Sequence, residues 1–197
     1  MNKSDFFSGL AASWDEEHSR PEEMESLRRF AVHLRLRPGE RVLDAGCGSG
    51  RLVPLVLEAV GAGGSLVALD FAANMIDLAR RKAQDERVEF IVGDAHELPF
   101  ADGEFDKVIA LALLPHLDDR LRALREFRRV LKPGGLLVIA HQLGREALDR
   151  LHAGSGGPVR RDLLPEKGTL ARLLEAAGYR ASEIADEPDR YLAWARA

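Results

Sequence analysis

The chain has 197 residues, of which 46% are hydrophobic, so it carries enough apolar material for one domain with a buried core. Its 28 basic and 32 acidic residues give a formal net charge of −4, which disfavours a general affinity for nucleic acid or an anionic membrane surface. One cysteine excludes an internal disulfide, and the N-terminus lacks the long apolar segment of a signal peptide. We therefore expect a cytoplasmic protein without membrane insertion.

The first helix that the residue pattern predicts covers residues 21–34. Pro21 and two glutamates occupy its first turn, apolar residues recur at helical spacing, and Arg37-Pro-Gly follows as a stop signal. The residues after it, up to about 141, predict alternating strands and helices.

A glycine-rich turn follows the first predicted strand. Val42-Leu-Asp-Ala-Gly-Cys-Gly-Ser-Gly50 passes from an apolar run through an acid to alternating glycines, and residues 51–60 predict a helix. Glycines allow the chain to turn sharply and its backbone to approach a ligand. A dinucleotide fingerprint requires a glycine at position 51, where Arg51 stands, so the spacing argues against a pyrophosphate site.

Two further predicted strands, 64–70 and 87–92, also lead into a carboxylate. The carboxyl ends of strands in an open parallel sheet line one crevice, so Asp44, Asp70 and Asp94 should converge beside the glycine loop. At that place in the series, Asp70 is suited to accept hydrogen bonds from a ribose diol. A ligand with hydroxyls, an amine and a positive charge fits this set, and S-adenosylmethionine offers all three.

The second half of the chain continues the strand–helix series. Helices are predicted near 72–84 and 118–131, and Lys132-Pro-Gly-Gly135 predicts a turn between the strand that ends near Ile109 and the next strand. A last helix over 166–178 precedes two short extended segments, 181–185 and 191–195. This order predicts a doubly wound α/β fold that ends in a hairpin.

Five motifs occur in a fixed order: Leu43-Asp-Ala-Gly-Cys-Gly-Ser-Gly50, Val67-Ala-Leu-Asp70, Val92-Gly-Asp-Ala95, Phe105-Asp-Lys-Val-Ile109 and Arg129-Val-Leu-Lys-Pro-Gly-Gly-Leu-Leu-Val-Ile139. With these motifs the chain resembles a class I S-adenosylmethionine-dependent methyltransferase, of the small-molecule branch that includes the ubiquinone and menaquinone biosynthesis methyltransferases. The resemblance implies a Rossmann-like, seven-stranded sheet that is mostly parallel, with an antiparallel C-terminal strand. It is strongest over residues 41–140.

The resemblance also implies a single methyltransferase domain over residues 1–197. Within it we expect an N-terminal helical lid (1–36), a cofactor-binding core (37–140), a cover over the acceptor site (141–165), and the last helix with the terminal hairpin (166–197). The expected activity is methyl transfer from S-adenosylmethionine to a small-molecule acceptor by in-line displacement.

Cofactor roles follow from the resemblance, residue by residue. Gly46 and Gly48 should approach the methionine moiety, with Asp44 beneath them holding the loop, and Asp70 should take the ribose hydroxyls. The adenine should lie against the residues Phe71, Met75, Asp94, Ala95 and Leu111. Two alternatives stay open, because Asp94 is also suited to cap a turn and Met75 shares a helical face with Leu78 and so also fits a core position.

On the acceptor side, the resemblance implies that Trp14 closes the site as part of the lid. His116 and His141 follow the fourth and fifth strands and are the candidate catalytic residues, and His152 is a candidate substrate-binding residue. A structural hydrogen bond is the alternative for each histidine. No metal site is predicted, because His116, His141, His152 and Asp162 lack any local ligand spacing. Cys47, inside the glycine loop, is interpreted as a packing residue.

Other functions remain open at this point. A non-catalytic S-adenosylmethionine- or S-adenosylhomocysteine-binding regulatory protein would use the same residues. A protein or RNA methyltransferase and a nicotinamide-dependent dehydrogenase are further alternatives, the last disfavoured by Arg51, Asp94 and the terminal hairpin. The basic stretch over 120–132 is interpreted as a solvated helix face. The sequence does not indicate the acceptor, the atom methylated or the number of subunits.

Overall fold

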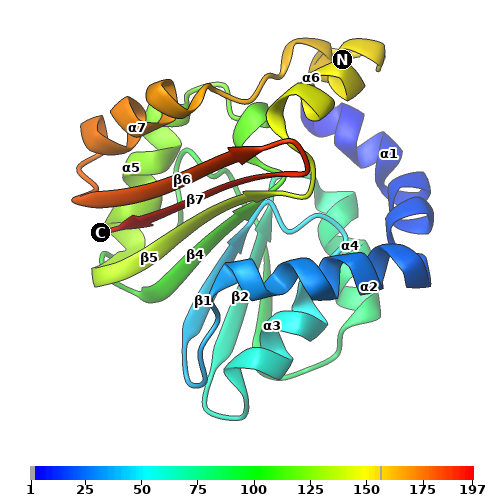
Figure 1. Cartoon of the computed structure of the whole chain (residues 1–197). Coiled ribbons are helices and arrows are strands. Elements are labelled where there is room, and N and C mark those ends of the chain that lie inside the picture. The colour runs from blue at the N-terminus through cyan, green and yellow to red at the C-terminus, as the bar shows by residue number, and fades with distance from the viewer. Residues whose placement is uncertain (1–2, 156) are drawn as a thin grey trace.

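A seven-stranded sheet forms the centre of the molecule. The computed structural model describes residues 3–155 and 157–197, apart from the side chains of Ser4, Ala12 and Trp14. The strands lie in the order β3-β2-β1-β4-β5-β7-β6, and only β7 runs antiparallel to its neighbours (Figure 1). Their bounds are β1 Arg41–Ala45, β2 Ser65–Asp70, β3 Val88–Val92, β4 Phe105–Leu111, β5 Leu131–His141, β6 Ala181–Glu187 and β7 Arg190–Arg196. The predicted sheet and its antiparallel C-terminal strand are confirmed.

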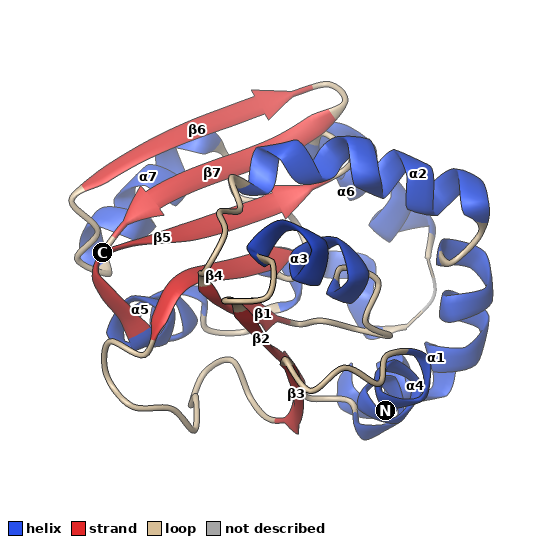
Figure 2. Ribbon diagram, turned by 90° about the horizontal axis from the view of Figure 1, so that it is seen from below, coloured by secondary structure: helices blue, strands red, loops and turns tan. Residues whose placement is uncertain are grey.

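Helices cover both faces of this sheet (Figure 2). One face carries α2 (Pro21–Phe30), α3 (Val53–Val60) and α4 (Ala73–Lys82), and the other carries α5 (Arg120–Val130), α6 (Arg145–Gly154) and α7 (Lys167–Ala176). The first helix, α1 (Lys3–His18), packs on α4 beside the sheet. Short 3₁₀ turns span Ala31–Leu34, Leu114–His116 and Pro158–Arg161.

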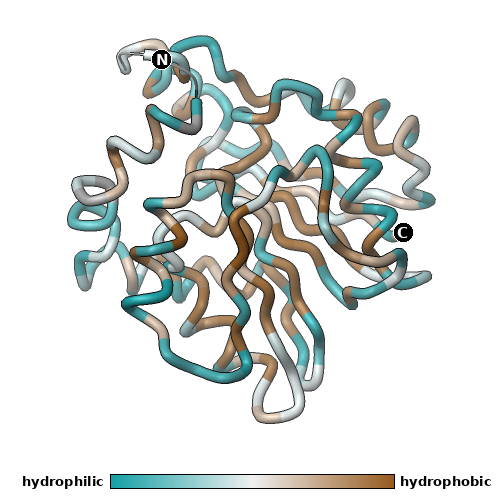
Figure 3. Tube along the Cα trace, turned by 180° about the vertical axis from the view of Figure 1, so that it is seen from behind, coloured by the Kyte–Doolittle hydropathy of each residue, from teal (hydrophilic) through white to brown (hydrophobic). Residues whose placement is uncertain are grey.

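The central strands are apolar on both faces because helices bury both. Leu43 and Val67 pack into the core under α5 and α7, whereas their neighbours Val42 and Leu66 pack into the core under α2 and α3. The hydrophobic trace through these strands is visible in Figure 3. Near-continuous apolar runs of this kind are typical of parallel strands covered on both sides. The polar residues at the ends of these strands therefore do not contribute to the hydrophobic core, and they are candidates for a functional role.

One predicted turn is wrong. Lys132-Pro-Gly-Gly135 lies inside β5 instead of preceding it, and the pairing of β5 with β4 shifts register between Phe105 and Lys107. Gly134 adopts a φ of +78°, and its N–H donates to the carbonyl of Ala197 at 3.2 Å. The glycines thus make an irregularity within a continuous strand, as in a β-bulge.

The order of the strands in the sheet indicates where a ligand would bind. Because β1 is followed along the chain by β2 and β3 on one side, and β4 and β5 extend the sheet on the other, the strand order reverses between β1 and β4. Ligands in open α/β sheets bind outside the carboxyl ends of the strands at such a reversal. Among residues 3–155 and 157–197, no helix combines the length and apolar character needed to cross a bilayer.

Candidate cofactor and acceptor site

The glycine loop between β1 and α3 is held against the end of β2. The N–H groups of Gly46 and Cys47 both donate to the carbonyl of Leu69, at 2.7 and 2.9 Å. Gly46 and Gly48 have φ angles of +75° and +54°, a region that side chains disfavour. A Cβ at Gly48 would meet no atom within 4 Å, so open space lies above this part of the loop.

Asp44 is the most unusual group of the site. Its side chain is 1% exposed, and neither carboxylate oxygen has a hydrogen-bond partner among the described residues. Burial raises the pKa of Asp44 to about 7, with a further contribution from the nearby Asp70 carboxylate. Asp44 was expected to hold the loop, but its carboxylate makes no hydrogen bond to the loop or to any other described residue. A buried carboxylate without a donor is instead suited to receive one from a ligand.

Asp70 is the residue that holds the loop. Its Oδ2 accepts from the N–H of Gly48 at 2.9 Å, and its Oδ1 accepts from the N–H of Ala72 at 2.9 Å. Burial raises the pKa of Asp70, although these backbone hydrogen bonds lower it in part. A carboxylate offers about four lone-pair sites, and the backbone N–H groups of Gly48, Phe71 and Ala72 act on this one, which leaves capacity for a ligand.

The adenine-side candidates lie around the ends of β2 and β3. Asp94 is exposed and accepts from the backbone N–H of His96 at 2.9 Å and bonds to its ring Nδ1 at 2.6 Å. Burial alone would raise the pKa of Asp94, but the hydrogen bonds from His96 lower it overall. Phe71 is 38% exposed, and its ring lies 5.9 Å from that of Phe7 on α1.

The remaining predicted adenine residues are packed into the molecule. Met75 lies buried between α1 and α4 against Ala11, as its core interpretation requires, and Leu111 packs beside the core under α2 and α3. Ala95 is buried after β3. Cys47 is buried against Ala68 and Ile76, and burial together with nearby Asp44 and Asp70 raises the pKa of its thiol. The structure therefore supports the interpretation of Cys47 as a packing residue.

Helix α1 extends over the carboxyl edge of the sheet and is tethered near both of its ends. Near its end, Asp15 accepts from the hydroxyl of Ser49 at 2.6 Å and pairs with Lys82 at 2.6 Å. At its start, Lys3 pairs with Asp118 at 2.8 Å. The side chain of Trp14, predicted to close the site, lies outside the described residues.

The three predicted acceptor-side histidines come together although they are distant in sequence. His116 follows β4, and its ring centroid is 5.2 Å from that of His152 on α6. His141 ends β5 and is 2% exposed, and its Nε2 is buried without a hydrogen-bond partner among the described residues. Burial, together with the nearby His116 and His152, lowers the pKa of His141 to about 3. His141 is therefore neutral at physiological pH.

Two charged residues on the acceptor side were not predicted as contacts. Asp162 bonds to the Nδ1 of His116 at 2.7 Å, and Lys3 lies 3.1 Å from the same carboxylate. No group of three or more His, Cys, Asp or Glu side chains in the described part of the chain is arranged to hold a metal ion. Sequence spacing gives no signal for these contacts, since Lys3 and Asp162 are 159 positions apart.

Arg51 also has an unsatisfied group. Its Nε and Nη2 atoms are buried without a partner in the described structure, and burial lowers the pKa of its guanidinium. Arg51 lines a cavity of about 600 Å³ between the end of α1, α2, α3 and α4. From the sequence, Arg51 was used only to exclude the dinucleotide fingerprint, and the burial of its side chain was not predicted.

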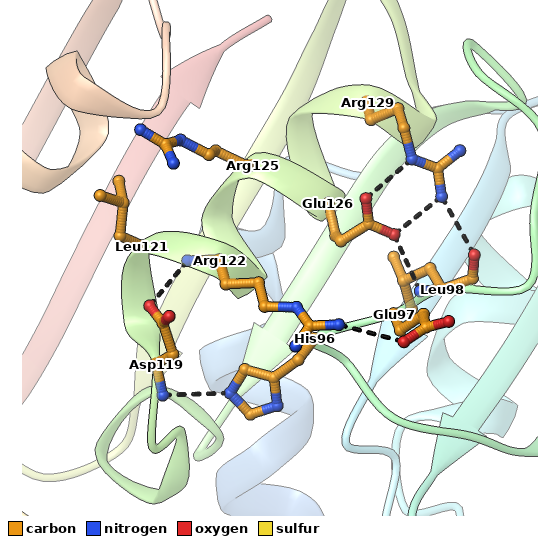
Figure 4. A pocket seen from close by; sticks show the side chains of 9 residues that line it. All are labelled: His96, Glu97, Leu98, Asp119, Leu121, Arg122, Arg125, Glu126 and Arg129. Carbon is orange, nitrogen blue, oxygen red and sulfur yellow. Dashed lines mark hydrogen bonds and ion pairs between the residues drawn. The ribbon is translucent and has the colours of Figure 1, made fainter.

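A second cavity, of about 530 Å³, lies beside α5 (Figure 4). Its arginines are engaged by neighbouring carboxylates, since Arg122 pairs with Glu97 at 3.0 Å and Arg129 pairs with Glu126 at 2.8 Å. Arg125 points away from these pairs in the same view. Because its charges are largely paired within the protein, this cavity does not compete with the sheet edge as the principal site.

Comparisons with known proteins agree with this geometry. Residues 43–139 match the family model described as a methyltransferase domain. The chain is 40% identical over 107 residues to demethylmenaquinone methyltransferase of Lysinibacillus sphaericus, covering 54% of this chain and 46% of that protein. It is also 40% identical over 112 residues to the enzyme of that name from Staphylococcus aureus, covering 56% and 46%. The chain thus spans about half the length of the curated relatives it matches.

Solved structures show the fold. A SAM-dependent methyltransferase of Aquifex aeolicus superposes with a TM-score of 0.75 at 22% identity, over 100% of this chain and 99% of that one. The [4+2]-cyclase SpnF superposes with a TM-score of 0.67 at 23% identity, over 86% and 79%. A cyclase among the neighbours illustrates that this fold alone does not define a reaction. Taken together, the family match over residues 43–139, the sequence relatives and these neighbours support a class I S-adenosylmethionine-dependent methyltransferase domain.

Proposed function

We propose that this chain transfers the methyl group of S-adenosylmethionine to a small-molecule acceptor by in-line displacement. The observation that carries the proposal is the buried, unpartnered carboxylate of Asp44 below an open glycine loop. A ligand with a cationic ammonium group would supply the donor that Asp44 lacks. The names of the sequence relatives, demethylmenaquinone methyltransferases, support a small-molecule acceptor.

Each part of the cofactor has a candidate partner. Asp44 would receive the ammonium group, the open space above Gly48, beside the backbone of Gly46, would hold the methionine chain, and the remaining lone pairs of Asp70 would accept from the ribose hydroxyls. The adenine would lie between Phe71 and the Asp94–Ala95 backbone, with Met75 and Leu111 as further walls. When bound, the cofactor supplies an activated methyl group on a sulfonium.

The protein's main contribution would be positioning. Holding the acceptor atom in line with the methyl group contributes about 7–11 kcal/mol to lowering a barrier of this kind. We assign the acceptor side to His116, His141 and His152, with Trp14 in the lid of residues 1–36 and the segment 141–165 as the cover. The neutral His141, with its unpartnered Nε2, is suited to orient a polar acceptor group.

The test is transfer of labelled methyl groups. The protein is incubated with radiolabelled S-adenosylmethionine and a bacterial metabolite extract from which macromolecules have been removed, and products are separated by chromatography. We expect label in one or a few small molecules. Gly48→Val is the matched control, because a branched side chain would fill the open space above the loop.

The outcomes separate the alternatives. Label that appears only when protein or RNA is restored would replace the small-molecule acceptor with a macromolecular one. If S-adenosylhomocysteine binds but no fraction of a complete lysate accepts label, a non-catalytic cofactor-binding protein is the correct function.

A further inference from the structure

His116 is held by groups from two distant parts of the chain, α1 and the segment that contains Asp162. The carboxylate of Asp162 bonds to its Nδ1 at 2.7 Å, and Lys3 of α1 donates to its backbone carbonyl at 2.9 Å. The ring of Phe7, also on α1, packs edge-on against it at 5.1 Å. These contacts restrict the ring of His116, whose side chain is 17% exposed, to one orientation.

The bond to Asp162 defines the protonation of the ring. An ionised carboxylate only accepts hydrogen bonds, so the proton of a neutral His116 lies on Nδ1 and its Nε2 carries the lone pair. Burial lowers the pKa of His116, although Asp162 raises it in part, so the neutral form prevails at neutral pH. Among the described residues, the side-chain hydrogen bond of His116 is made through Nδ1 and leaves Nε2 for a ligand.

Asp162 is itself fixed and kept ionised. Burial alone would raise its pKa, but the hydrogen bonds from His116 and Lys3 lower it overall. Lys3 also pairs with Asp118, whose side chain is 81% exposed and bonds to Lys3 rather than to the His116 ring. The other titratable groups that face His116 are His152 on α6 and His141 on β5, and both are close enough to act on it electrostatically.

We propose that Asp162 and Lys3 are positioning residues that hold His116 as a general base for a protic acceptor, so that the base is complete only when α1 and segment 141–165 both lie over the sheet. The inference rests on the proposed function and deepens it. It names the acceptor class: a molecule whose reacting oxygen or nitrogen carries a proton, such as a hydroxylated ring or an amine.

The step balances without another reactant. Nε2 of His116 takes the proton from the acceptor atom, and that atom forms the new bond to the methyl carbon. The carbon–sulfur bond breaks, and its electron pair remains on sulfur, which becomes a neutral thioether. The positive charge passes to the His116 imidazolium, which the Asp162 carboxylate stabilises at 2.7 Å. A metal ion is not required.

The test is an NMR titration of ¹⁵N-histidine-labelled full-length protein bound to S-adenosylhomocysteine, with His116→Gln used to assign the signal. We expect His116 in the wild type to be neutral at pH 7 with its proton on Nδ1. Asp162→Asn should lower the pKa of His116 because it removes the anionic partner. Lys3→Met should raise that pKa because it removes a nearby cation.

Asp118→Asn is the matched control, because Asp118 also pairs with Lys3 but bonds to Lys3 rather than to the His116 ring. It should leave the His116 titration unchanged. Shifts of opposite sign for Asp162→Asn and Lys3→Met would not arise from general loosening of the fold. A wild-type ring that carries its proton on Nε2, or is charged at pH 7, would overturn the proposal without any variant.

The kinetic arm uses whichever fraction of the metabolite extract accepts label. Asp162→Asn should lower kcat about tenfold or more, as expected when a general base is misplaced. The Kd of S-adenosylhomocysteine should stay within about twofold, since Asp162 does not contact the cofactor residues. Equal kcat in Asp162→Asn and Asp118→Asn would refute the role of His116 as a general base. A wild type that transfers no label would refute the proposed function instead. The NMR titration does not depend on turnover, so the two failures can be told apart.

Discussion

Replacing Asp44 with Asn should stabilise the ligand-free protein while weakening its binding of S-adenosylhomocysteine. Burial raises the pKa of Asp44 from 3.8 to about 7, which means that the folded state disfavours the ionised carboxylate. At about 1.4 kcal/mol per pKa unit, this rise corresponds to roughly 4 kcal/mol of destabilisation well above pH 7. An unpartnered amide carries about the same burial penalty, about 1–3 kcal/mol, as the unpartnered protonated carboxyl that it replaces, so most of the roughly 4 kcal/mol remains as a net gain well above pH 7.

The pH dependence gives this prediction its signature. Between the two pKa values, folded Asp44 binds a proton that the unfolded chain does not, so the stability of the wild type falls as pH rises from 3.8 towards about 7. The advantage of Asp44→Asn should therefore be present at about pH 8 and shrink towards zero near pH 4. Urea unfolding followed by circular dichroism measures both values. Calorimetry measures the loss of S-adenosylhomocysteine affinity, which we expect to be about tenfold or more.

Two results would contradict this reasoning. If the variant is no more stable than the wild type at about pH 8, Asp44 is not an unpaired buried charge. If stability rises but S-adenosylhomocysteine binds as before, the carboxylate is unsatisfied for a reason unrelated to the cofactor. A group that weakens the fold and strengthens binding is a mark of a functional site.

Four further predictions follow from the same geometry. Saturating S-adenosylhomocysteine should raise the melting temperature, by a stabilisation of about 2.7 kcal/mol at 100 times Kd, and no shift would refute the cofactor site. Gly48→Ala should weaken that binding in calorimetry, whereas Gly39→Ala, also at positive φ in open space, should lose only stability. Asp70→Ala should raise Kd about tenfold or more, because it removes both the loop contact to Gly48 and the ribose acceptor; an unchanged Kd would exclude that role. His141→Leu should keep or raise stability at pH 7 in urea unfolding, because a buried unpaired nitrogen is lost, yet lower turnover; unaltered turnover would make His141 structural.

The sequence predicted the sheet well because its signals are local. Apolar runs that end in Asp44 and Asp70, and the glycine loop between them, determine strand, turn and helix without reference to the rest of the chain. The turn predicted at Lys132-Pro-Gly-Gly135 was wrong for the same reason, because that prediction also used only local signals. Its glycines signal a turn locally, but pairing with β4 and with the C-terminal residues keeps them inside β5.

The site was predicted less completely than the fold. The candidate carboxylates were identified correctly as strand-end residues, but which of them holds the loop depends on where the loop N–H groups point in three dimensions. The structure assigns that contact to Asp70 and leaves Asp44 unpartnered. The Lys3–Asp162–His116 group joins residues up to 159 positions apart, as Lys3 and Asp162 are, and no periodicity or spacing in a single sequence reports such a contact.

A crystal structure with S-adenosylhomocysteine tests the central claim most directly. The account predicts the ligand outside the carboxyl ends of β1 and β2, with its ammonium group at the Asp44 carboxylate, its ribose hydroxyls on Asp70, and its adenine beside Phe71 and Asp94. A ligand bound elsewhere, for example in the cavity beside α5, or an Asp44 carboxylate that remains without a donor in the complex, would contradict it.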